Sequence, residues 1–295
     1  MTTYRVVHAT AYAYEEAVTS SYGQVYLLPR NTESQRVRTS RVMVSPSPRD
    51  ERERRDLFGN RVGYFHVERA HTELVITATS EVEVLDGPAA LPLEAARTLA
   101  DIQVAVTALS GPERLVATQF QLDSERATVD DQVRGYAEPS FAPDRPVGES
   151  LVDLSHRIHA DFEFAADATK VTSTIDDLFE SKAGVCQDFA HLAVACIRSV
   201  GLPARYVSGY LETVPPPGRP RLAGADVSHA WAGAYLPEVG WIDIDPTNDQ
   251  FVDNRYITNA WGRDYADVAP VKGVIYSDGS LDEMTVSVDV ERLSD

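Results

Sequence analysis

The sequence contains only two cysteines and no long apolar run. Cys186 and Cys196 stand ten residues apart in one predicted helix, which separates them by about 15 Å of rise, too far for a disulfide. No apolar stretch approaches the ~20 residues that a membrane span requires. The N-terminal residues Met1–Arg5 lack the basic and then apolar segments of a signal peptide. We therefore expect a cytoplasmic protein, since the cytoplasm keeps thiols reduced.

Positive charge is also scarce. The chain has 27 Lys and Arg, only three of them Lys, against 45 Asp and Glu, for a net charge of −18. Most of the excess lies in residues 97–295, which carry 16 basic and 32 acidic side chains. Because such a surface repels nucleic acid and anionic lipid, we expect neither a nucleic-acid nor a membrane partner.

The stretch Gly184–His191 places a thiol where a loop turns into a helix. Apolar residues recur after Cys186 at helical intervals, and Gly201-Leu202-Pro203 ends the run. The unpaired N–H groups and the positive dipole end of such a helix favour a thiolate and can stabilise an oxyanion. A lone cysteine is nevertheless more often a small core residue, which is our interpretation of Cys196.

A predicted hairpin downstream supplies an imidazole and a carboxylate. Ser228–Leu236 alternates small and large residues, Pro237–Gly240 forms a turn, and Trp241–Thr247 is a second short strand. His229 begins one arm and Asp245 lies near the end of the other, so the two side chains come within reach of each other. Cysteine, histidine and aspartate are the nucleophile, base and orienting group of thiol-dependent acyl transfer.

The register of this hairpin leaves two aspartates open. A plain four-residue loop pairs Leu236 with Trp241 and places Asp245 on the face opposite His229. A one-residue bulge, with Gly240 in the left-handed conformation, brings both Asp243 and Asp245 onto the His229 face. Parity alone does not choose between them.

Three blocks between about residues 150 and 250 resemble the bacterial transglutaminase-like proteins, which are relatives of the papain-type thiol enzymes: GVCQDFAHL, RSVGLPARYVSGYL and SHAWAGAYLPEVGWIDIDPTND. The resemblance implies Cys186 as nucleophile, His229 as general base and acid, and Asp245 as the orienting carboxylate. It implies an α+β, papain-like core in which the nucleophile helix packs on an antiparallel sheet. The first residues resemble the β-rich domain that often precedes this core.

The N-terminal residues 1–88 are predicted to form this β-rich domain. No helical pattern separates its strands, which favours an antiparallel sheet or sandwich. The segment Ser47–Arg55 is predicted to be a charged connector. The candidate strands are Tyr4–Thr10, Tyr22–Leu28, Arg36–Ser45, Arg61–Val67 and Glu73–Val84.

Two further segments complete the predicted organisation. The breakers in Asp86–Pro92 mark the domain boundary, and residues 89–148 are predicted to be a linker and helical segment. Residues 149–295 form the predicted catalytic core. Its expected elements include helices Thr174–Glu180 and Glu149–Phe162, strand Ala204–Glu212 and a final strand, Met284–Leu293; in residues 89–148 the candidate helices are Leu93–Ser110 and Thr128–Tyr136.

Other candidate site residues have weaker patterns. His156 and His159 share a helical side at metal-ligand spacing, but no third ligand accompanies them, so we expect no metal and no cofactor. His191 lies about 140° around the helix from Cys186 and points away from it. The proline-rich loop Thr213–Gly224 is either a cleft rim or an ordinary surface loop, and Trp261 either closes one side of the cleft or packs.

The predicted function is acyl transfer on a carboxamide or peptide bond of a protein or peptide substrate. The thioester would be resolved by an amine co-substrate or by water, and the sequence does not choose between them. It leaves open the second oxyanion donor, the role of the N-terminal domain and the oligomeric state. The alternatives are a catalytically silent module that binds a protein or peptide, and a metal-dependent hydrolase, for which we find no ligand set.

Overall fold

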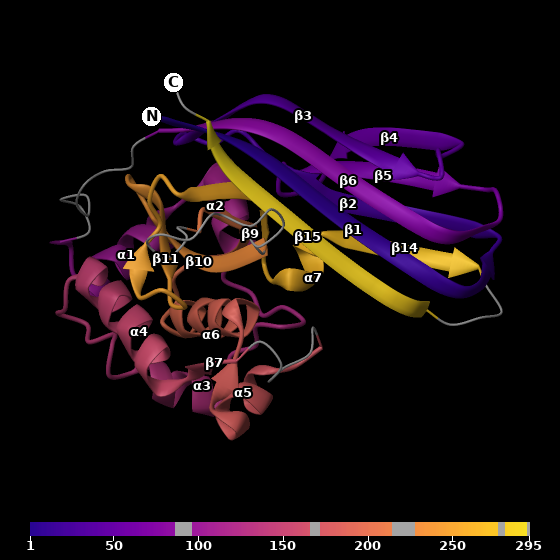
Figure 1. Cartoon of the computed structure of the whole chain (residues 1–295). Coiled ribbons are helices and arrows are strands. Elements are labelled where there is room, and N and C mark those ends of the chain that lie inside the picture. Colours follow the sequence, from indigo (N-terminus) through magenta and orange to yellow (C-terminus); the bar gives the residue numbers. More distant parts are fainter. Residues whose placement is uncertain (86–95, 166–171, 214–227, 277–280, 294–295) are drawn as a thin grey trace, which may run out of the picture.

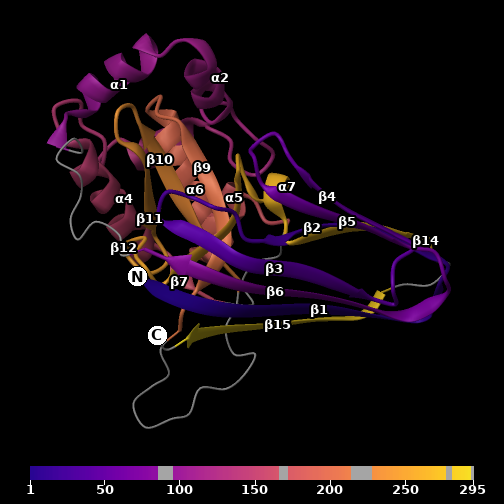
Figure 2. The same cartoon turned by 90° about the horizontal axis from the view of Figure 1, so that it is seen from above.

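The computed structural model describes residues 1–85, 96–165, 172–213, 228–276 and 281–293. It places a long β-sandwich beside a smaller sheet that helices cover (Figures 1 and 2). Apart from the two-residue pair β7 (Glu163–Phe164) and β8 (Ala183–Gly184), the strand pairs of the described residues are antiparallel. None of the helices in these ranges is long and apolar enough to cross a membrane.

The sandwich consists of two four-stranded sheets, in the orders β15-β1-β6-β3 and β14-β2-β5-β4. Its core lies between the sheets, where alternate residues such as Phe65 and Ile76 are buried. The strands are β1 (Thr2–Val18), β2 (Ser20–Leu28), β3 (Gln35–Ser45), β4 (Asp50–Arg55), β5 (Arg61–Val67), β6 (His71–Val84), β14 (Val271–Tyr276) and β15 (Leu281–Leu293).

The five strands expected in residues 1–88 are present, but the prediction of a charged connector at Ser47–Arg55 is wrong in part. Asp50–Arg55 forms the edge strand β4, which pairs with β5 from Asp50↔His66 to Arg55↔Arg61. Most of its side chains are exposed, so it has no apolar alternation to recognise. Charged side chains on an edge strand discourage pairing with another chain. A strand of this kind has the charged composition of a solvated loop, so the sequence pattern did not identify it.

The second sheet has the order β12-β11-β10-β9-β13, and the buried helix α6 (Cys186–Ser199) packs against β9 and β10 (Figure 1). Helices α3 and α4 contact α6 as well. The strands are β9 (Ala204–Leu211), β10 (Ser228–Leu236), β11 (Gly240–Asp245), β12 (Gln250–Phe251) and β13 (Tyr256–Gly262). The other helices are α1 (Leu99–Ala108), α2 (Gly111–Gln119), α3 (Asp131–Ala137), α4 (Val147–Asp161), α5 (Ile175–Ser181) and α7 (Tyr265–Val268).

The two longest elements of this part that were not predicted are α2 and β13. Helix α2 begins with Gly111-Pro112, directly after the predicted helix ends at Ser110. Proline is tolerated in a first helical turn because its missing N–H has no partner there. Strand β13 mixes polar and apolar residues because both of its faces are largely covered. Neither element has the period that would identify it.

The last two strands return to the sandwich. β14 pairs with β2, and β15 pairs with β1 from Thr3↔Leu293 to Tyr14↔Leu281 (Figures 1 and 2). The final strand, which we had placed with residues 149–295, therefore lies in the N-terminal sheets, where its last residue Leu293 pairs with Thr3. The boundary segment Asp86–Pro92 falls outside the described residues, so the domain limits at 88 and 148 stay a prediction.

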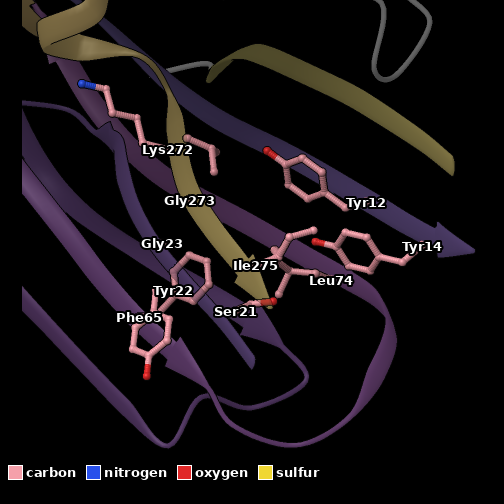
Figure 3. A pocket seen from close by; sticks show the side chains of 11 residues that line it. Tyr12, Tyr14, Ser21, Tyr22, Gly23, Phe65, Leu74, Lys272, Gly273 and Ile275 are labelled. Carbon is pink, nitrogen blue, oxygen red and sulfur yellow. The ribbon is translucent and has the colours of Figure 1, made fainter. Parts of the chain in front are cut away.

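A cavity of about 180 Å³ lies in the sandwich, between β1 and β14 (Figure 3). Gly23 and Gly273 pair across β2 and β14, so neither strand supplies a side chain at that position. The Phe65 ring covers Gly23, where an added Cβ would lie 2.2 Å from its Cζ. The rings of Tyr12 and Tyr14 on β1 are stacked on each other, and their hydroxyls are directed toward β14 (Figure 3). None of the proposed site residues lines this cavity.

Two side-chain amides join the sandwich to the edge strand β13. Gln35 donates to the Thr258 carbonyl and accepts from the Thr258 N–H, both at 2.8 Å. Asn60 likewise donates to the Trp261 carbonyl at 2.8 Å and accepts from the Trp261 N–H at 3.0 Å. Both amides are buried, so they satisfy backbone groups that an edge strand would otherwise leave unpaired.

We expect Asn60→Leu to destabilise the protein by about 2–5 kcal/mol, because it removes both partners of the buried Trp261 backbone groups and leaves them unsatisfied. Urea unfolding followed by tryptophan fluorescence measures the change. The control is Gln132→Leu, which alters an exposed amide on α3 and should leave stability within about 0.5 kcal/mol. Equal unfolding midpoints for the two variants would contradict a role for the amide in joining the sheets.

Candidate active site

Cys186 is the first residue of α6, as the sequence indicated. The Val185 N–H at the helix cap donates to the Asp188 Oδ2 at 2.9 Å, which holds the first turn. Gly184 has no room for a side chain, since an added Cβ would lie 2.8 Å from the Leu178 Cδ1. Cys186 is only partly buried, whereas Cys196 is completely buried and burial raises the pKa of its thiol well above the ordinary value. Cys186 is therefore the accessible thiol of the two.

His229 and Asp245 lie in contact, with 2.7 Å between the Nε2 and the Oδ2. The hairpin pairs Leu236 with Gly240 and Ala232 with Ile244, one residue away from the plain four-residue loop. Gly240 has a φ of 94°, in the left-handed region. This is the register that the bulged alternative predicted, although the pairing runs from Ala232 to Leu236 without a bulge. It brings both Asp243 and Asp245 onto the His229 face.

Asp243 faces a different partner. Its carboxylate accepts from the Arg205 Nη2 at 2.9 and 3.0 Å and from the Trp231 Nε1 at 3.3 Å. Gly233 makes room for this ion pair, because an added Cβ would lie 2.1 Å from the Asp243 Oδ1. Arg205 neutralises Asp243, and Asp245 is the carboxylate that meets the imidazole.

Trp261 packs against two guanidinium groups, and its closing one side of a cleft stays a prediction. The Arg30 guanidinium carbon lies 3.1 Å from the centroid of its ring, and that of Arg205 lies 4.1 Å from it. Arg205 also lies 4.5 Å from the centroid of Trp241. Stacked cations and rings of this kind stabilise one another when they are desolvated. Trp261 thus connects the sandwich to the Arg205–Asp243 pair.

The Asp245 carboxylate is completely buried and accepts five hydrogen bonds. Its Oδ2 accepts from His229, from the Tyr256 hydroxyl at 2.6 Å and from the Asn248 Nδ2 at 2.7 Å. Its Oδ1 accepts from the N–H groups of Thr247 and Asn248 at 2.9 and 3.3 Å. Burial acts to raise the pKa of Asp245, but the hydrogen bonds with His229, Asn248 and Tyr256 outweigh it and lower that pKa. Asp245 is therefore held as an anion.

The imidazole of His229 is bonded on both sides. Its Nε2 meets Asp245, and the ring also shares a hydrogen bond with the Cys186 side chain, for which the Nδ1 is the remaining nitrogen. Burial acts to lower the pKa of His229, but the hydrogen bonds and charges of Asp245 and Cys186 raise it to about 10. The ring is consequently protonated near neutral pH when the thiolate is its partner.

The other histidines have partners outside this group. The His191 Nε2 accepts from the Tyr265 N–H at 3.2 Å, and burial lowers its pKa. The Nδ1 atoms of His156 and His159 meet the Asp249 carboxylate at 2.8 Å and the Thr247 carbonyl at 3.0 Å. Within the described ranges, no group of three or more His, Cys, Asp or Glu could hold a metal ion.

Two contacts of Asp245 were not identified from the sequence. Asn248 lies three residues away in the same turn, and its position after the Asp-Pro pair was the only local signal. Tyr256 lies in the unpredicted strand β13, where no pattern relates it to the site. The loop Thr213–Gly224, proposed as a cleft rim, falls outside the described residues except for Thr213.

Comparison with known proteins gives matches over both parts of the chain. The family model of the bacterial transglutaminase-like N-terminal region matches residues 4–83, and that of the transglutaminase-like superfamily matches residues 134–246. An uncharacterized protein of Mycobacterium tuberculosis is 45% identical over 299 residues, which cover 97% of this chain and 92% of the relative.

A protein-glutamine gamma-glutamyltransferase of Pseudomonas aeruginosa is 31% identical over 123 residues, which are 41% of this chain and 18% of that protein. The crystal structure of a candidate cysteine protease of Cytophaga hutchinsonii has a TM-score of 0.75 and 22% identity, and the match covers 100% of this chain and 91% of that one. These comparisons confirm the predicted fold class, an α+β core that a β-rich domain precedes.

Proposed function

Because the chain belongs to the transglutaminase-like superfamily, we propose that it is a thiol-dependent acyl-transfer enzyme, either a transglutaminase-like acyltransferase or a cysteine peptidase or amidase. Cys186 is the proposed nucleophile, His229 the general base and acid, and Asp245 the group that orients His229. The contacts of His229 carry the proposal, since one ring nitrogen meets the carboxylate and the ring also bonds the accessible thiol.

The first half of the proposed reaction forms a thioester. The Cys186 Sγ, as a thiolate paired with the protonated His229, attacks the carbonyl carbon of a carboxamide or peptide bond. The negative charge on the carbonyl oxygen is stabilised by N–H groups at the start of α6, including that of Cys186. The C–N bond then breaks, and His229 gives its proton to the departing ammonia or amine.

The second half releases the acyl group. A primary amine or a water molecule attacks the thioester carbon, His229 takes the proton of that acceptor, and the Cys186 thiolate leaves. Transamidation follows with an amine, and deamidation or hydrolysis follows with water. The name of the Pseudomonas aeruginosa relative favours a glutamine carboxamide as the acyl donor. We therefore propose a protein or peptide substrate that carries glutamine.

Alkylation by iodoacetamide tests the proposal without a known substrate. We expect Cys186 to react at pH 6 about 100-fold faster than glutathione, because a protonated imidazole beside the sulfur favours the thiolate. The pKa of His229 is raised to about 10, so the ring is protonated at pH 6 and loses its proton only as the pH rises toward 10. His229→Ala should reduce the rate at pH 6 by about 100-fold and make it rise steeply with pH. Mass spectrometry of the labelled peptides separates Cys186 from Cys196.

The same measurement addresses the alternative of a catalytically silent binding module. In that case Cys186 would react no faster than glutathione, and His229→Ala would leave its rate unchanged. A glutamine-peptide panel, incubated with and without a primary amine and followed by ammonia release, then distinguishes amine from water as the acceptor.

A further inference from the structure

Tyr256 lies against the proposed site from a strand that contributes nothing else to it. It begins β13, and its side chain is almost completely buried. Its hydroxyl lies 2.6 Å from the Asp245 Oδ2, the same oxygen that meets the His229 Nε2 at 2.7 Å. Its ring packs edge-on against Trp231, with 5.3 Å between the centroids, and 6.0 Å from His229.

We propose that Tyr256 is a positioning residue, whose hydroxyl holds the Asp245 carboxylate ionised and directed at His229. The proposal rests on the proposed function, because it assigns a role toward the same imidazole. Tyr256 would not touch the substrate or the reacting atoms, and it would act through Asp245.

A chain of hydrogen bonds fixes the direction in which the hydroxyl donates. The Arg255 Nη2 donates to the Gln250 Oε1 at 2.9 Å, and a guanidinium can only donate. The Gln250 amide is therefore turned so that its Nε2 donates to the Tyr256 hydroxyl oxygen. The hydroxyl hydrogen then has Asp245 as its acceptor. Asp253 anchors the outer end of this chain by pairing with Arg255.

The surroundings of Asp245 make its pKa depend on the Tyr256 hydroxyl. On β10 the carboxylate faces His229, and on β13 it faces Tyr256; the neighbouring Asp243 is already neutralised by Arg205. Asp245 is completely buried, so bulk solvent does not reach it, and leaving one of its acceptor sites without a donor is costly. The hydrogen bond of Tyr256 is one of those that lower the pKa of Asp245. Removing it therefore raises that pKa, so Asp245 is neutralised at a higher pH as the pH falls.

The strand that supplies the hydroxyl is itself held in place. β13 pairs with β9 along one edge, and Gln35 and Asn60 of the sandwich bond its other edge. Tyr256 thus has a fixed backbone, a packed ring and a directed hydroxyl. This combination is what a positioning role requires, because a carboxylate that must be oriented needs a rigid donor.

The test is the pH dependence of Cys186 alkylation by iodoacetamide in Tyr256→Phe, from pH 4 to 9. We expect the alkylation rate on the plateau of the pH profile to fall about tenfold. The acidic limb, where the rate decreases as the pH is lowered, should move up by about one pH unit, as the loss of one hydrogen bond to a charged group implies. The control is Tyr210→Phe, which removes another buried hydroxyl of the same sheet. That hydroxyl contacts the His8 Nδ1 at 2.9 Å, so its loss should leave the profile unchanged.

Gln250→Leu is a second variant that keeps Tyr256 and its packing. It removes the amide that donates to the hydroxyl oxygen, which makes the hydroxyl a weaker donor to Asp245. We therefore expect a shift of the acidic limb in the same direction, by about half a pH unit. This variant tests the positioning role of Tyr256 if Tyr256→Phe does not fold.

The outcomes separate the two proposals. If wild type reacts fast, His229→Ala does not, and Tyr256→Phe or Gln250→Leu overlays wild type, the positioning role is overturned while the proposed function stands. If wild-type Cys186 reacts no faster than glutathione, both proposals fall. A shifted acidic limb in the Tyr256 and Gln250 variants, with Tyr210→Phe unchanged, supports the role.

Discussion

Asp245→Asn is expected to lower turnover by about 10³–10⁴-fold while leaving the fold intact. The amide is nearly isosteric, but it carries no charge, and its NH₂ group can face the His229 Nε2 as a donor. The ring would then hold its proton on Nδ1, toward the thiol, where it cannot act as a base. Ammonia release from the glutamine-peptide panel measures turnover, and circular dichroism checks the fold.

Asp243→Asn is the matched control, because strand parity places Asp243 on the same face as Asp245. The Asp243 carboxylate pairs with Arg205, with 2.9 Å between the Oδ2 and the Nη2. Loss of this charge leaves a nearly buried guanidinium without its counter-charge. We expect lower stability, with turnover within about threefold of wild type at a temperature where the variant is folded. Similar turnover losses in the two variants would contradict the assignment of Asp245.

Gly209→Ala is expected to have the largest effect on stability. Gly209 lies in the interior strand β9 and pairs with His229 on one side and Thr258 on the other. An added Cβ would lie 2.1 Å from the Ile257 carbonyl oxygen and 2.6 Å from the Trp231 Cη2. Neither a paired backbone nor a buried indole can move aside, so we expect a loss of about 4 kcal/mol or more, or no soluble protein.

Gly135→Ala provides the comparison for the same chemical change. Gly135 lies inside α3, where an added Cβ meets nothing within 4 Å. Alanine there should stabilise the protein by up to about 1 kcal/mol, because glycine is a poor helix former. Urea unfolding of both variants measures the difference. Equal midpoints would show that the packing between β9, β10 and β13 is looser than the structure indicates.

Local patterns predicted the elements that bury one face or one stripe. The sandwich strands alternate because one side of each sheet meets the core, and α4 buries one side of a helix. α6 is buried on all sides, and it was recognised from the helical spacing of its large apolar residues and from the Gly201-Leu202-Pro203 end signal. Two of the strands that were missed lack such a contrast. β4 is exposed on both faces and β13 is largely covered on both, so neither shows a period of two.

The pairing of the strands could be predicted from the sequence less well than the strands themselves. The sequence predicted a final strand near Met284–Leu293, and β15 covers that range. Its partner is β1, almost the whole chain away, because the sandwich sheet leaves an open edge there. An alternating pattern indicates that a strand has a buried face, but it says nothing about which sheet supplies the neighbour.

The sequence by itself determined the chemical groups of the candidate site: a thiol at the start of a helix, and an imidazole and a carboxylate on the two arms of a hairpin. Only the tertiary structure decided which carboxylate meets the imidazole. Two aspartates share the His229 face, and Arg205 of β9 pairs with Asp243 while Tyr256 of β13 bonds Asp245. A period of two specifies the face of a strand, whereas the partner of each side chain depends on strands that are distant in the chain and adjacent in the sheet.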